Sequence, residues 1–531
     1  MKRRADTLDA VLRAQARRLP ERTALVSPER RVGYRELDAA VGRLAGRLAA
    51  LGLAAGDRVV VHLPNSIEFI LLIFSLFRLG VIPVLALPGH RRNEIDHLCK
   101  MAEAVGYVIP DSCAGFDYTT LAEAVREGNP GLRHVIVAGH PDGDLDELFL
   151  PSGGSALPSY RPESEFPDPR SEGLALLLLS GGTTGAPKLI PRTHRDYLYN
   201  IRESAAVCGL DTDTVYLAAL PAAHNFALGC PGVLGTLAVG GTVVLAPDAS
   251  PDQAFPLIAR ERVTVSALTP PLLTLWLAEA AWTDADLSSL RLLQVGGARL
   301  GRAEAARVGP ELGCRLQQVF GMAEGLLCFT RPDDPEETVL TTQGRPLSAA
   351  DQLRVVDGEE REVAPGEVGE LLVRGPYTVR GYYRAAEYNA TAFTADGYYR
   401  TGDLVRITPT GHLVVEGRVK DVINRGGEKV PAAEVEDHLS AHPSVAQAAL
   451  VGMPDQLLGE RSCAYVVPHG TAPTLPELSA FLRERGLAAY KLPDRLEVVP
   501  ALPRTGAGKV DKRELATGIA ARLRAERLAR T

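Results

Sequence analysis

Apolar side chains recur three and four positions apart over the first 50 residues, which predicts two amphipathic helices there. The two apolar faces comprise Leu8, Val11, Leu12 and Leu19, then Leu37, Val41, Leu44 and Leu48. The stretch 67–87 is strongly apolar but is interrupted by Glu68, Arg78, Gly80 and Pro83. We therefore interpret it as a buried helix followed by a strand, and not as a membrane span.

Short β-rich runs follow, with apolar or helical stretches between several of them. They lie at 58–61, 81–87, 134–137, 174–179, 242–245, 263–265 and 292–295. Apolar strands that alternate with helices are typical of layered α/β folds with buried parallel strands. The fold class predicted for this part is therefore α/β.

The pattern changes after about residue 340. Runs at 353–356, 370–373 and 412–415 are separated by turns that contain glycine, which predicts a small, β-barrel-like antiparallel subdomain. The last 110 residues again mix strands and helices, with apolar runs at 435–439, 445–451 and 464–467 and helices over 475–485 and 512–527. A segment rich in glycine and charge at 418–421 separates two patterned regions. We expect a domain of residues 1–417, a hinge at 418–421 and an α+β domain of residues 422–531.

Composition narrows the class of protein. The 531 residues are 46% hydrophobic and 23% charged, which is typical of globular chains and argues against disorder or a coiled coil. A net charge of −7 argues against a general nucleic-acid binder, although it leaves room for a local basic patch. Seven widely spaced cysteines without a CxxC pair argue against a disulfide framework or a zinc site. No apolar segment follows the basic start at 1–4, so we expect a cytoplasmic protein without membrane insertion.

The most informative local segment is 177–188, where an apolar strand leads into a loop with three glycines, hydroxyl side chains and a lysine. Glycines let backbone N–H groups close around phosphate oxygens, and lysine adds positive charge. The segment is neither a Walker A loop nor a GxGxxG turn. A plain surface turn is the alternative interpretation.

This segment resembles the signature loop of the adenylate-forming superfamily, which includes acyl-CoA synthetases, peptide-synthetase adenylation domains and aryl acid ligases. Further motifs agree in order, at 320–324, 399–403, 417–421, 424–429 and 502–509. The resemblance covers essentially the whole chain. It implies a large N-terminal domain followed by a small, mobile C-terminal domain, with ATP and Mg²⁺ as cofactors.

The resemblance also implies roles for individual residues. Glu324 would hold Mg²⁺ against ATP phosphates, since one carboxylate plus phosphate oxygens is usual for magnesium; its alternative is a solvated loop acid. Asp403 would accept the ribose hydroxyls, unless it only caps a turn. Lys420 would lie at the hinge. The ATP-binding candidates are Ser180, Gly181, Gly182, Thr183, Thr184, Gly185, Lys188, Gly297, Ala298, Gly321, Met322, Ala323, Asp403, Arg418 and Lys420.

Lys509 lies in a Gly-Ala-Gly-Lys loop. By resemblance it reaches between the carboxylate and the nucleotide and offsets charge as the carboxylate attacks the α-phosphate. The catalytic candidates are Lys509, Glu324 and His224.

The segment 221–232 resembles the aryl acid–AMP ligase subgroup, which is best known for 2,3-dihydroxybenzoate. The motifs at 191–194, 322–326 and 423–429 agree. Amino-acid-activating domains carry an acid here that pairs with the substrate ammonium, whereas this chain has His224 and Asn225. The substrate-binding candidates are His224, Asn225, Cys230, Gly297, Val319, Leu327 and Lys509.

Two positions depart from the dihydroxybenzoate pattern, which has serine in place of Cys230 and valine in place of Leu327. A thiol is a weak hydrogen-bond partner for a ring 3-hydroxyl, and leucine adds only bulk. The same two replacements resemble salicylate-activating members. We therefore expect salicylate as the acid, with 2,3-dihydroxybenzoate, 3-hydroxypicolinate and 3-hydroxyanthranilate as alternatives. Neutral repacking of a core is the other interpretation of Cys230 and Leu327.

Aryl adenylates are passed to a thiol in this family. The chain shows no carrier domain after its last predicted helix, so we expect a separate partner, the phosphopantetheinylated aryl carrier protein of a siderophore or other nonribosomal peptide pathway. An aromatic acyl-CoA synthetase that uses coenzyme A is the alternative. Intact Lys188, Glu324, Asp403, Arg418 and Lys509 argue against a non-enzymatic binding relative.

Overall fold

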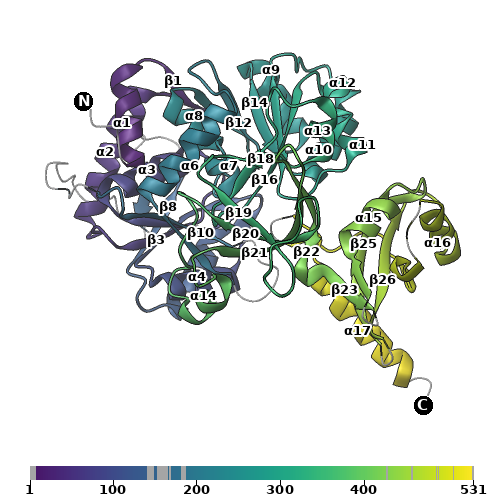
Figure 1. Ribbon diagram of the computed structural model, residues 1–531. Coiled ribbons are helices and arrows are strands. Elements are labelled where there is room, and N and C mark those ends of the chain that lie inside the picture. The colour runs from purple at the N-terminus through teal and green to yellow at the C-terminus, as the bar shows by residue number, and fades with distance from the viewer. Residues whose placement is uncertain are drawn as a thin grey trace. The chain divides into compact units, whose positions relative to one another are not determined.

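The computed structural model describes residues 7–139, 149–151, 166, 169–180, 187–425, 428–455, 458–485, 487, 489–505 and 508–528 (Figure 1). The described chain forms two compact units. Of the described residues, the larger unit comprises those up to 180, 187–352 and 373–399, and the smaller unit comprises 353–372 and those from 400 onward. This mixed α/β chain, with a large N-terminal and a small C-terminal part, confirms the predicted fold class.

A seven-stranded sheet in the larger unit has the order β11-β10-β4-β3-β5-β8-β9. Its strands are β3 (Arg58–Val61), β4 (Ile82–Leu85), β5 (Gly106–Pro110), β8 (His134–Ala138), β9 (Phe149–Pro151), β10 (Leu174–Leu179) and β11 (Leu189–Thr193). The pairs from β10 through β8 are parallel, and β9 and β11 pair antiparallel at the two edges. The predicted apolar runs therefore form buried parallel strands.

Helix α3 (Ile67–Leu79) joins β3 to β4, as the stretch 67–87 predicts. Ser66 caps its start by accepting a hydrogen bond from the Phe69 amide, and Gly80 ends it at φ +74°. Every residue of α3 except Glu68 is buried. The neighbouring elements are α4 (Arg92–Ala102), α5 (Tyr118–Gly128), β6 (Ser112–Cys113) and β7 (Phe116–Asp117). Within the described residues, no helix has both the length and the apolarity that crossing a bilayer requires.

A nine-stranded sheet, also in the larger unit, has the order β18-β17-β16-β15-β14-β12-β13-β1-β2. Its strands are β1 (Thr23–Val26), β2 (Arg31–Gly33), β12 (Val215–Ala218), β13 (Thr242–Leu245), β14 (Val265–Leu268), β15 (Leu292–Gly296), β16 (Arg315–Gly321), β17 (Leu327–Phe329) and β18 (Arg345–Pro346). The strand expected at 263–265 begins only at Val265, because the Thr264 side chain already bonds the Val215 backbone ahead of it.

Helices α9 (Pro251–Glu261), α10 (Pro270–Ala280), α11 (Arg302–Ala305), α12 (Val308–Leu312) and α13 (Glu336–Thr341) gather around the later strands of this sheet (Figure 1). The two predicted N-terminal helices are α1 (Leu8–Arg18) and α2 (Tyr34–Ala50). Leu8, Val11 and Leu12 of α1 and the four predicted positions of α2 are buried. The remaining helices of this unit are α6 (His194–Val207), α7 (Asn225–Gly229), α8 (Gly232–Val239) and α14 (Ala386–Ala392).

The smaller unit contains most of a four-stranded sheet with the order β19-β20-β21-β22. Its strands are β19 (Gln352–Val356), β20 (Gly369–Arg374), β21 (Tyr399–Ile407) and β22 (Leu413–Arg418). A five-stranded sheet follows, in the order β24-β23-β26-β25 with β27 paired to β26. It comprises β23 (Val422–Arg425), β24 (Glu428–Pro431), β25 (Val445–Asp455), β26 (Gly459–Pro468) and β27 (Arg495–Val498).

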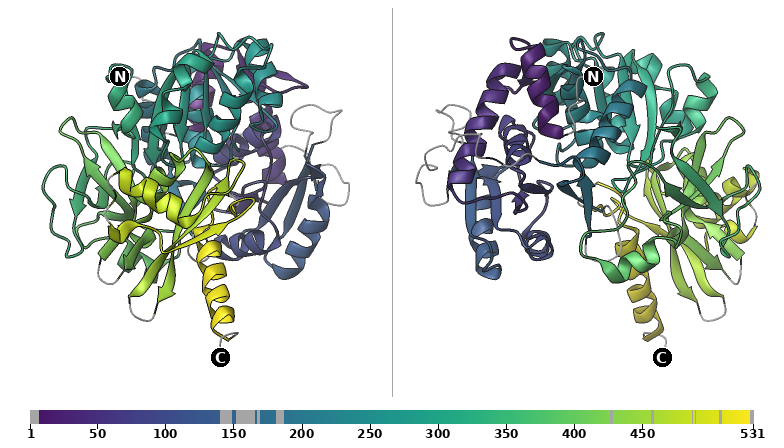
Figure 2. Two further views of the ribbon diagram at one scale, coloured as in Figure 1. Left: turned by 90° about the vertical axis from the view of Figure 1, so that its right-hand side faces the viewer. Right: turned by 60° about the vertical axis from the view of Figure 1, so that its left-hand side comes forward.

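Successive residues of β25 serve two separate cores. Leu450 packs with residues of α15 (Ala432–Ser440) and α16 (Leu475–Glu484), whereas Ala449 and Val451 pack with residues of α17 (Lys512–Leu528). Both views in Figure 2 show α17 leading to the end of the chain. Short 3₁₀ segments lie at Val419–Asp421 (η3) and Ala489–Lys491 (η4). The alternation of side chains along a strand thus places helices on both faces of the sheet.

Candidate active site

Helix α6 holds the short helix α7 at both of its ends. The Tyr197 hydroxyl donates to Asn225 Oδ1 at 2.8 Å, and Asn200 Nδ2 donates to the Gly229 carbonyl at 2.6 Å. Gly229 makes room for this contact, because a Cβ there would lie 2.6 Å from the Tyr197 oxygen. Two side chains one turn apart on α6 therefore fix the backbone and the first side chain of α7.

The three candidates on and beside α7 lie in different environments. His224 is exposed and caps α7, its Nδ1 accepting from the Phe226 amide at 3.3 Å. Asn225 is half-buried, and its Nδ2 donates to Cys230 Sγ at 3.4 Å. The Cys230 thiol donates in turn to the Asn225 carbonyl at 3.4 Å. Burial raises the pKa of Cys230 to about 12, so this thiol remains protonated near neutral pH.

Cys230 belongs to one buried apolar cluster, which we name the Cys230 cluster. Its buried members are Cys208, Leu220, Phe226, Ala227, Cys230, Ala267, Val319, Leu327, Phe329, Leu347 and Tyr377. Three candidates widely separated in sequence, Cys230, Val319 and Leu327, thus come together. Gly321 pairs with Leu327 across β16 and β17, and a Cβ on Gly321 would lie 2.4 Å from Leu327 Cδ2. The absence of a side chain at Gly321 admits the leucine.

Glu324 lies in a tight turn directly after β16, as its glycine-flanked sequence predicts. The Met322 amide donates to the Leu326 carbonyl at 3.0 Å, and the Gly325 amide donates to the Met322 carbonyl at 3.1 Å. Gly325 has φ +122°, and a Cβ there would lie 2.2 Å from the Tyr377 carbonyl oxygen. Only glycine fits this position.

The Glu324 carboxylate is buried, with 7% of the residue exposed. Its Oε1 accepts from the Tyr382 hydroxyl at 2.6 Å, and that hydroxyl lies 2.8 Å from the hydroxyl of Tyr399. Burial and the negative charge of Glu324 raise the pKa of Tyr382, so the phenol keeps its proton. In the described part of the chain, no group of three or more His, Cys, Asp or Glu side chains could hold a metal ion. A single carboxylate at Glu324 suits Mg²⁺ that is also bound by phosphate oxygens.

Arg192 and Tyr197 are two buried residues of this region that the sequence-based assignment of roles missed. Arg192 is 1% exposed and Tyr197 is 0% exposed. The Arg192 Nη1 atom donates to the Ala323 carbonyl at 2.7 Å, next to Glu324. The sequence carried a signal at Arg192, which follows three largely apolar residues and stands four positions before Asp196.

The phosphate-loop candidates are described only at the two flanks of the loop. The Lys188 amide donates to Ser180 Oγ at 3.0 Å, and the Ser180 amide donates to the Lys188 carbonyl at 2.9 Å. Lys188 Nζ lies 3.8 Å from the ring centroid of Tyr388. Gly181, Gly182, Thr183, Thr184 and Gly185 lie outside the described residues. Gly297 (φ +84°) and Ala298 are exposed directly after β15.

The second group of candidates lies in the smaller unit. Asp403 and Arg418 face each other across β21 and β22, and their Oδ1 and Nε atoms lie 2.9 Å apart. Asp403 is 5% exposed, and its amide donates to Thr401 Oγ1 at 3.0 Å. Lys420 lies in η3, but its side chain is outside the described part of the structure.

Lys509 is exposed and closes a tight turn. The Thr505 amide donates to the Lys509 carbonyl at 2.7 Å, and the Gly508 amide donates to the Thr505 carbonyl at 2.8 Å. Gly508 has φ +78° with no atom within 4 Å of a Cβ position, so its backbone conformation and not crowding favours glycine.

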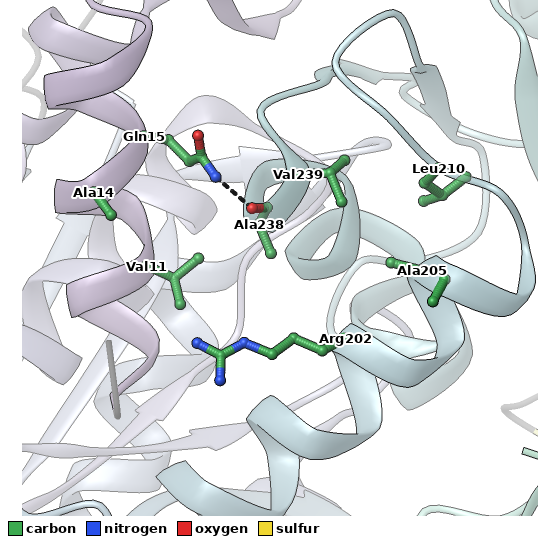
Figure 3. Close-up of a pocket in the computed structure, with 9 residues that line it drawn as sticks. Val11, Ala14, Gln15, Arg202, Ala205, Leu210, Ala238 and Val239 are labelled. Atoms are coloured by element: carbon green, nitrogen blue, oxygen red, sulfur yellow. Dashed lines mark hydrogen bonds between the residues drawn. The ribbon is translucent and has the colours of Figure 1, made fainter. Parts of the chain in front are cut away.

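A separate cavity of about 310 Å³ lies among α1, α6 and α8 (Figure 3). Val11, Ala14, Arg202, Ala205, Leu210 and Val239 line it, together with Gln15, whose amide nitrogen donates to the Ala238 carbonyl. The cavity contains none of the predicted site residues and is not the candidate active site.

Comparison with known proteins identifies relatives along nearly the whole chain. The family model described as AMP-binding enzyme matches residues 12–383, and that of the AMP-binding enzyme C-terminal domain matches 434–509. A 2,3-dihydroxybenzoate-AMP ligase of Bacillus subtilis is 55% identical, over 98% of this chain and 94% of its own. A salicyl-AMP ligase / salicyl-S-ArCP synthetase of Mycobacterium tuberculosis is 50% identical, over 96% and 90%. The apo structure of MbtA from Mycobacterium smegmatis is 48% identical, covers 97% and 95%, and has a TM-score of 0.71.

Proposed function

Since the chain belongs to the AMP-binding enzyme family, and within it to the ATP-dependent aryl acid–AMP ligases, we propose that the acid it activates is salicylate. The carboxylate oxygen attacks the α-phosphorus of ATP, the bond to the bridging oxygen breaks, and pyrophosphate leaves. A thiol sulfur then attacks the acyl carbon of the salicyl adenylate, and AMP leaves. No covalent bond to the protein is required, so positioning and charge carry the catalysis.

The hydrogen bonding of Cys230 is the single observation that carries this choice of acid. The thiol accepts from Asn225 Nδ2 and donates to the Asn225 carbonyl, so both of its roles are filled by one residue. A ring 3-hydroxyl placed against Cys230 and Leu327 would meet a thiol that is already engaged and an apolar side chain. Burying a hydroxyl without a partner costs about 1–3 kcal/mol. Salicylate, which has no 3-hydroxyl, avoids this cost.

Asn225 supports recognition of the ortho position. Because the Tyr197 hydroxyl donates to Asn225 Oδ1, the amide nitrogen is the end directed toward Cys230. An N–H group at this place suits an ortho oxygen or a carboxylate, both of which accept hydrogen bonds. His224, Val319 and Gly297 complete the proposed surroundings of the ring.

ATP would be held by two groups of residues. Ser180 to Gly185, Lys188, Ala298 and the segment from Gly321 to Ala323 would contact the base and phosphates, and Asp403 with Arg418 would contact the ribose. Mg²⁺ bound by Glu324 would neutralise phosphate charge and favour departure of pyrophosphate. The exposed Lys509 would supply positive charge to the attacking carboxylate.

The smaller part of the chain would change its orientation between the two half-reactions. We place the pivot at residues 418–421, around Lys420, between a domain of residues 1–417 and a domain of residues 422–531. The acceptor we propose is the phosphopantetheine thiol of an aryl carrier protein in a cytoplasmic siderophore or other nonribosomal peptide pathway.

The test is ATP-dependent release of pyrophosphate with salicylate, 2,3-dihydroxybenzoate, benzoate, 3-hydroxypicolinate and 3-hydroxyanthranilate. We expect salicylate to exceed dihydroxybenzoate in kcat/KM by about tenfold or more, up to the roughly 100-fold that an apolar pocket achieves against an added hydroxyl. A higher kcat/KM for dihydroxybenzoate than for salicylate would show that Cys230 and Leu327 only fill the core and do not select the acid. A lead for the pyridine or amino-substituted acid would overturn salicylate and keep the adenylation chemistry.

A second assay identifies the acceptor. The purified chain is given salicylate, ATP and either a phosphopantetheinylated aryl carrier protein or free coenzyme A. Faster thioester formation on the carrier supports the proposal, and faster formation of salicyl-CoA would identify an aromatic acyl-CoA synthetase.

A further inference from the structure

We infer that Arg192 is a positioning residue that couples the acid-binding amide of Asn225 to the turn that carries Glu324. The inference rests on the proposed function in two respects, namely that Asn225 contacts the acid and that Glu324 binds the Mg²⁺ of MgATP. Arg192 itself is placed against neither acid nor nucleotide. It would act through Tyr197 on one side and through Ala323 on the other.

The position of Arg192 follows from its strand. It lies on β11 opposite Leu176 of β10, at a register that directs its side chain into the protein, and it is 1% exposed. Nε donates to Asp196 Oδ1 at 2.7 Å. The other oxygen of Asp196 accepts from the amide and the hydroxyl of Thr193, the cap of α6, at 2.8 Å and 2.7 Å. An ion pair between the buried Arg192 and the half-buried Asp196 therefore ties the guanidinium to the start of α6.

Tyr197 connects the guanidinium to the acid side. Arg192 Cζ lies 4.9 Å from the centroid of the Tyr197 ring, which is within the range of a cation–π contact. The ring carries the hydroxyl that donates to Asn225 Oδ1 at 2.8 Å. That hydrogen bond decides which end of the Asn225 amide faces Cys230. Without it, an amide can turn by 180° and present oxygen where the acid requires a donor.

Ala323 connects the guanidinium to the metal-binding turn. Arg192 Nη1 donates at 2.7 Å to the carbonyl that directly precedes Glu324. On its other side, the Val379 amide donates to the Glu324 carbonyl at 2.8 Å and Tyr382 holds the carboxylate. The arginine thus fixes the peptide plane through which Glu324 enters its turn.

Only arginine can make these contacts together. Its planar fork donates in several fixed directions and its face stacks on an aromatic ring, whereas lysine is a point charge on a flexible stem. Among the described residues, Arg192 Nη2 is buried without a hydrogen-bond partner. The guanidinium is therefore held by its two other nitrogens and by the Tyr197 ring. Lysine at this position would keep the charge and lose the geometry.

A kinetic double-mutant cycle tests the coupling, using R192K, Y197F and the double variant in ATP–pyrophosphate exchange. The measured quantity is the ratio of kcat/KM for salicylate to that for benzoate, which reports recognition of the ortho position. We expect each single variant to lower this ratio by about tenfold, the value of one hydrogen bond to a charged or strongly polar group. The double variant should match Y197F alone, because Arg192 acts on the acid through Tyr197.

A second measurement separates the contact of Arg192 with Tyr197 from its contact with Ala323. R192K should also raise KM for MgATP, through Ala323 and Glu324, whereas Y197F should leave it unchanged. R195K is the matched control, since Arg195 is an exposed arginine of α6 paired with Glu172. It should reproduce the wild type in both measurements.

The outcomes are distinguishable. Additive losses in the cycle, or an unchanged salicylate-to-benzoate ratio in Y197F, would overturn the inference and leave the proposed function intact. The Y197F result is decisive even if R192K does not fold, because that variant removes a single hydroxyl. A wild-type chain that is indifferent to the ortho substituent would overturn the choice of acid, and the inference with it.

Discussion

Asn225 and Cys230, which we propose bind the acid, differ from Lys509 in how firmly the protein holds them. Asn225 and Cys230 are held by the hydrogen bond from Tyr197 to Asn225 and by two hydrogen bonds between Asn225 and Cys230, and Cys230 is 1% exposed. Lys509 is exposed in a turn next to Gly508, where a Cβ would have no atom within 4 Å. Selecting one acid among similar ones requires groups that are already in place. A lysine that serves only one of two half-reactions is better placed on a turn.

We expect the largest effect, and the sharpest test of this difference, from substitution of Lys509. We expect K509A to lower adenylate formation by about 1,000-fold, because the charge opposite the attacking carboxylate is lost. Thioester formation from preformed salicyl adenylate should remain near the wild-type rate. Pyrophosphate release and single-turnover transfer measure the two steps separately, with K100A as the control on another exposed lysine. Equal losses in both steps would indicate a structural role for Lys509.

Substitution of Glu324, which is held in place by Tyr382, should have the next largest effect on activity. E324Q keeps an oxygen for the Tyr382 hydroxyl and removes the negative charge, so the turn should persist while Mg²⁺ affinity falls. We expect kcat/KM for MgATP to fall by about 100-fold, with partial recovery as Mg²⁺ is raised. Pyrophosphate exchange across a magnesium series measures this, and the exposed Glu336 gives the control variant E336Q. A loss that magnesium does not relieve would argue against ligation by Glu324.

The Cys230 position should change selectivity more than rate. C230S supplies an oxygen with two lone pairs, which can accept from a ring 3-hydroxyl while keeping its hydrogen bonds to Asn225, so kcat/KM for dihydroxybenzoate relative to salicylate should rise by about tenfold. The ratio from competition between the two acids measures this. An unchanged ratio would indicate that the 3-position of the ring does not lie against Cys230.

Leu327 should have a smaller effect in the same direction. L327V removes one methylene, which is worth about fourfold in relative affinity for the bulkier acid. The same competition assay applies, and L220V, a matched truncation in the Cys230 cluster, serves as the control. An equal shift in both variants would mean that the cluster responds to volume and not to position.

The effect of pH should be the smallest near neutrality. Because burial raises the pKa of Cys230 to about 12, we expect no thiol titration in the salicylate rate between about pH 6 and 8. Cys99, Cys314 and Cys463 likewise have pKa values raised from 9.0 to about 12. Unfolding lets these thiols ionise, so their contribution to stability is complete below pH 9 and declines as pH rises toward 12. Thermal unfolding monitored from pH 7 to 10.5 should show Tm falling only above about pH 9.

Local patterns predicted the elements well and the long-range contacts poorly. The spacing of Leu8, Val11 and Leu12 indicated α1, and the apolar runs indicated the parallel strands, because each signal lies within one element. The start of β14 was wrong by two residues, since a side-chain contact between Thr264 and Val215 is not visible in local sequence. The motifs identified Glu324, Asp403 and Lys509 as candidates through resemblance.

The sequence did not assign roles to Arg192 and Tyr197. Their contacts join positions 131 and 28 residues apart, and a buried arginine in a strand resembles any strand residue until its partners are known. Gly229 carried a faint signal, because a glycine at the end of a helix can mark either a cap or a close approach. The structure shows the close approach, to the Tyr197 hydroxyl.

The hydrogen bonds by which α6 holds α7 have a consequence for redesign. The Asn225 side chain is held by Tyr197 of α6, whereas Cys230 and Leu327 pack in the Cys230 cluster. In the proposed function, Leu327 would therefore set tolerance at the neighbouring ring carbon independently of ortho recognition, whereas Cys230 shares two hydrogen bonds with Asn225 and would link the two traits. A laboratory that wished to load unnatural hydroxybenzoates would vary Leu327 first and leave Asn225, Cys230 and α6 untouched.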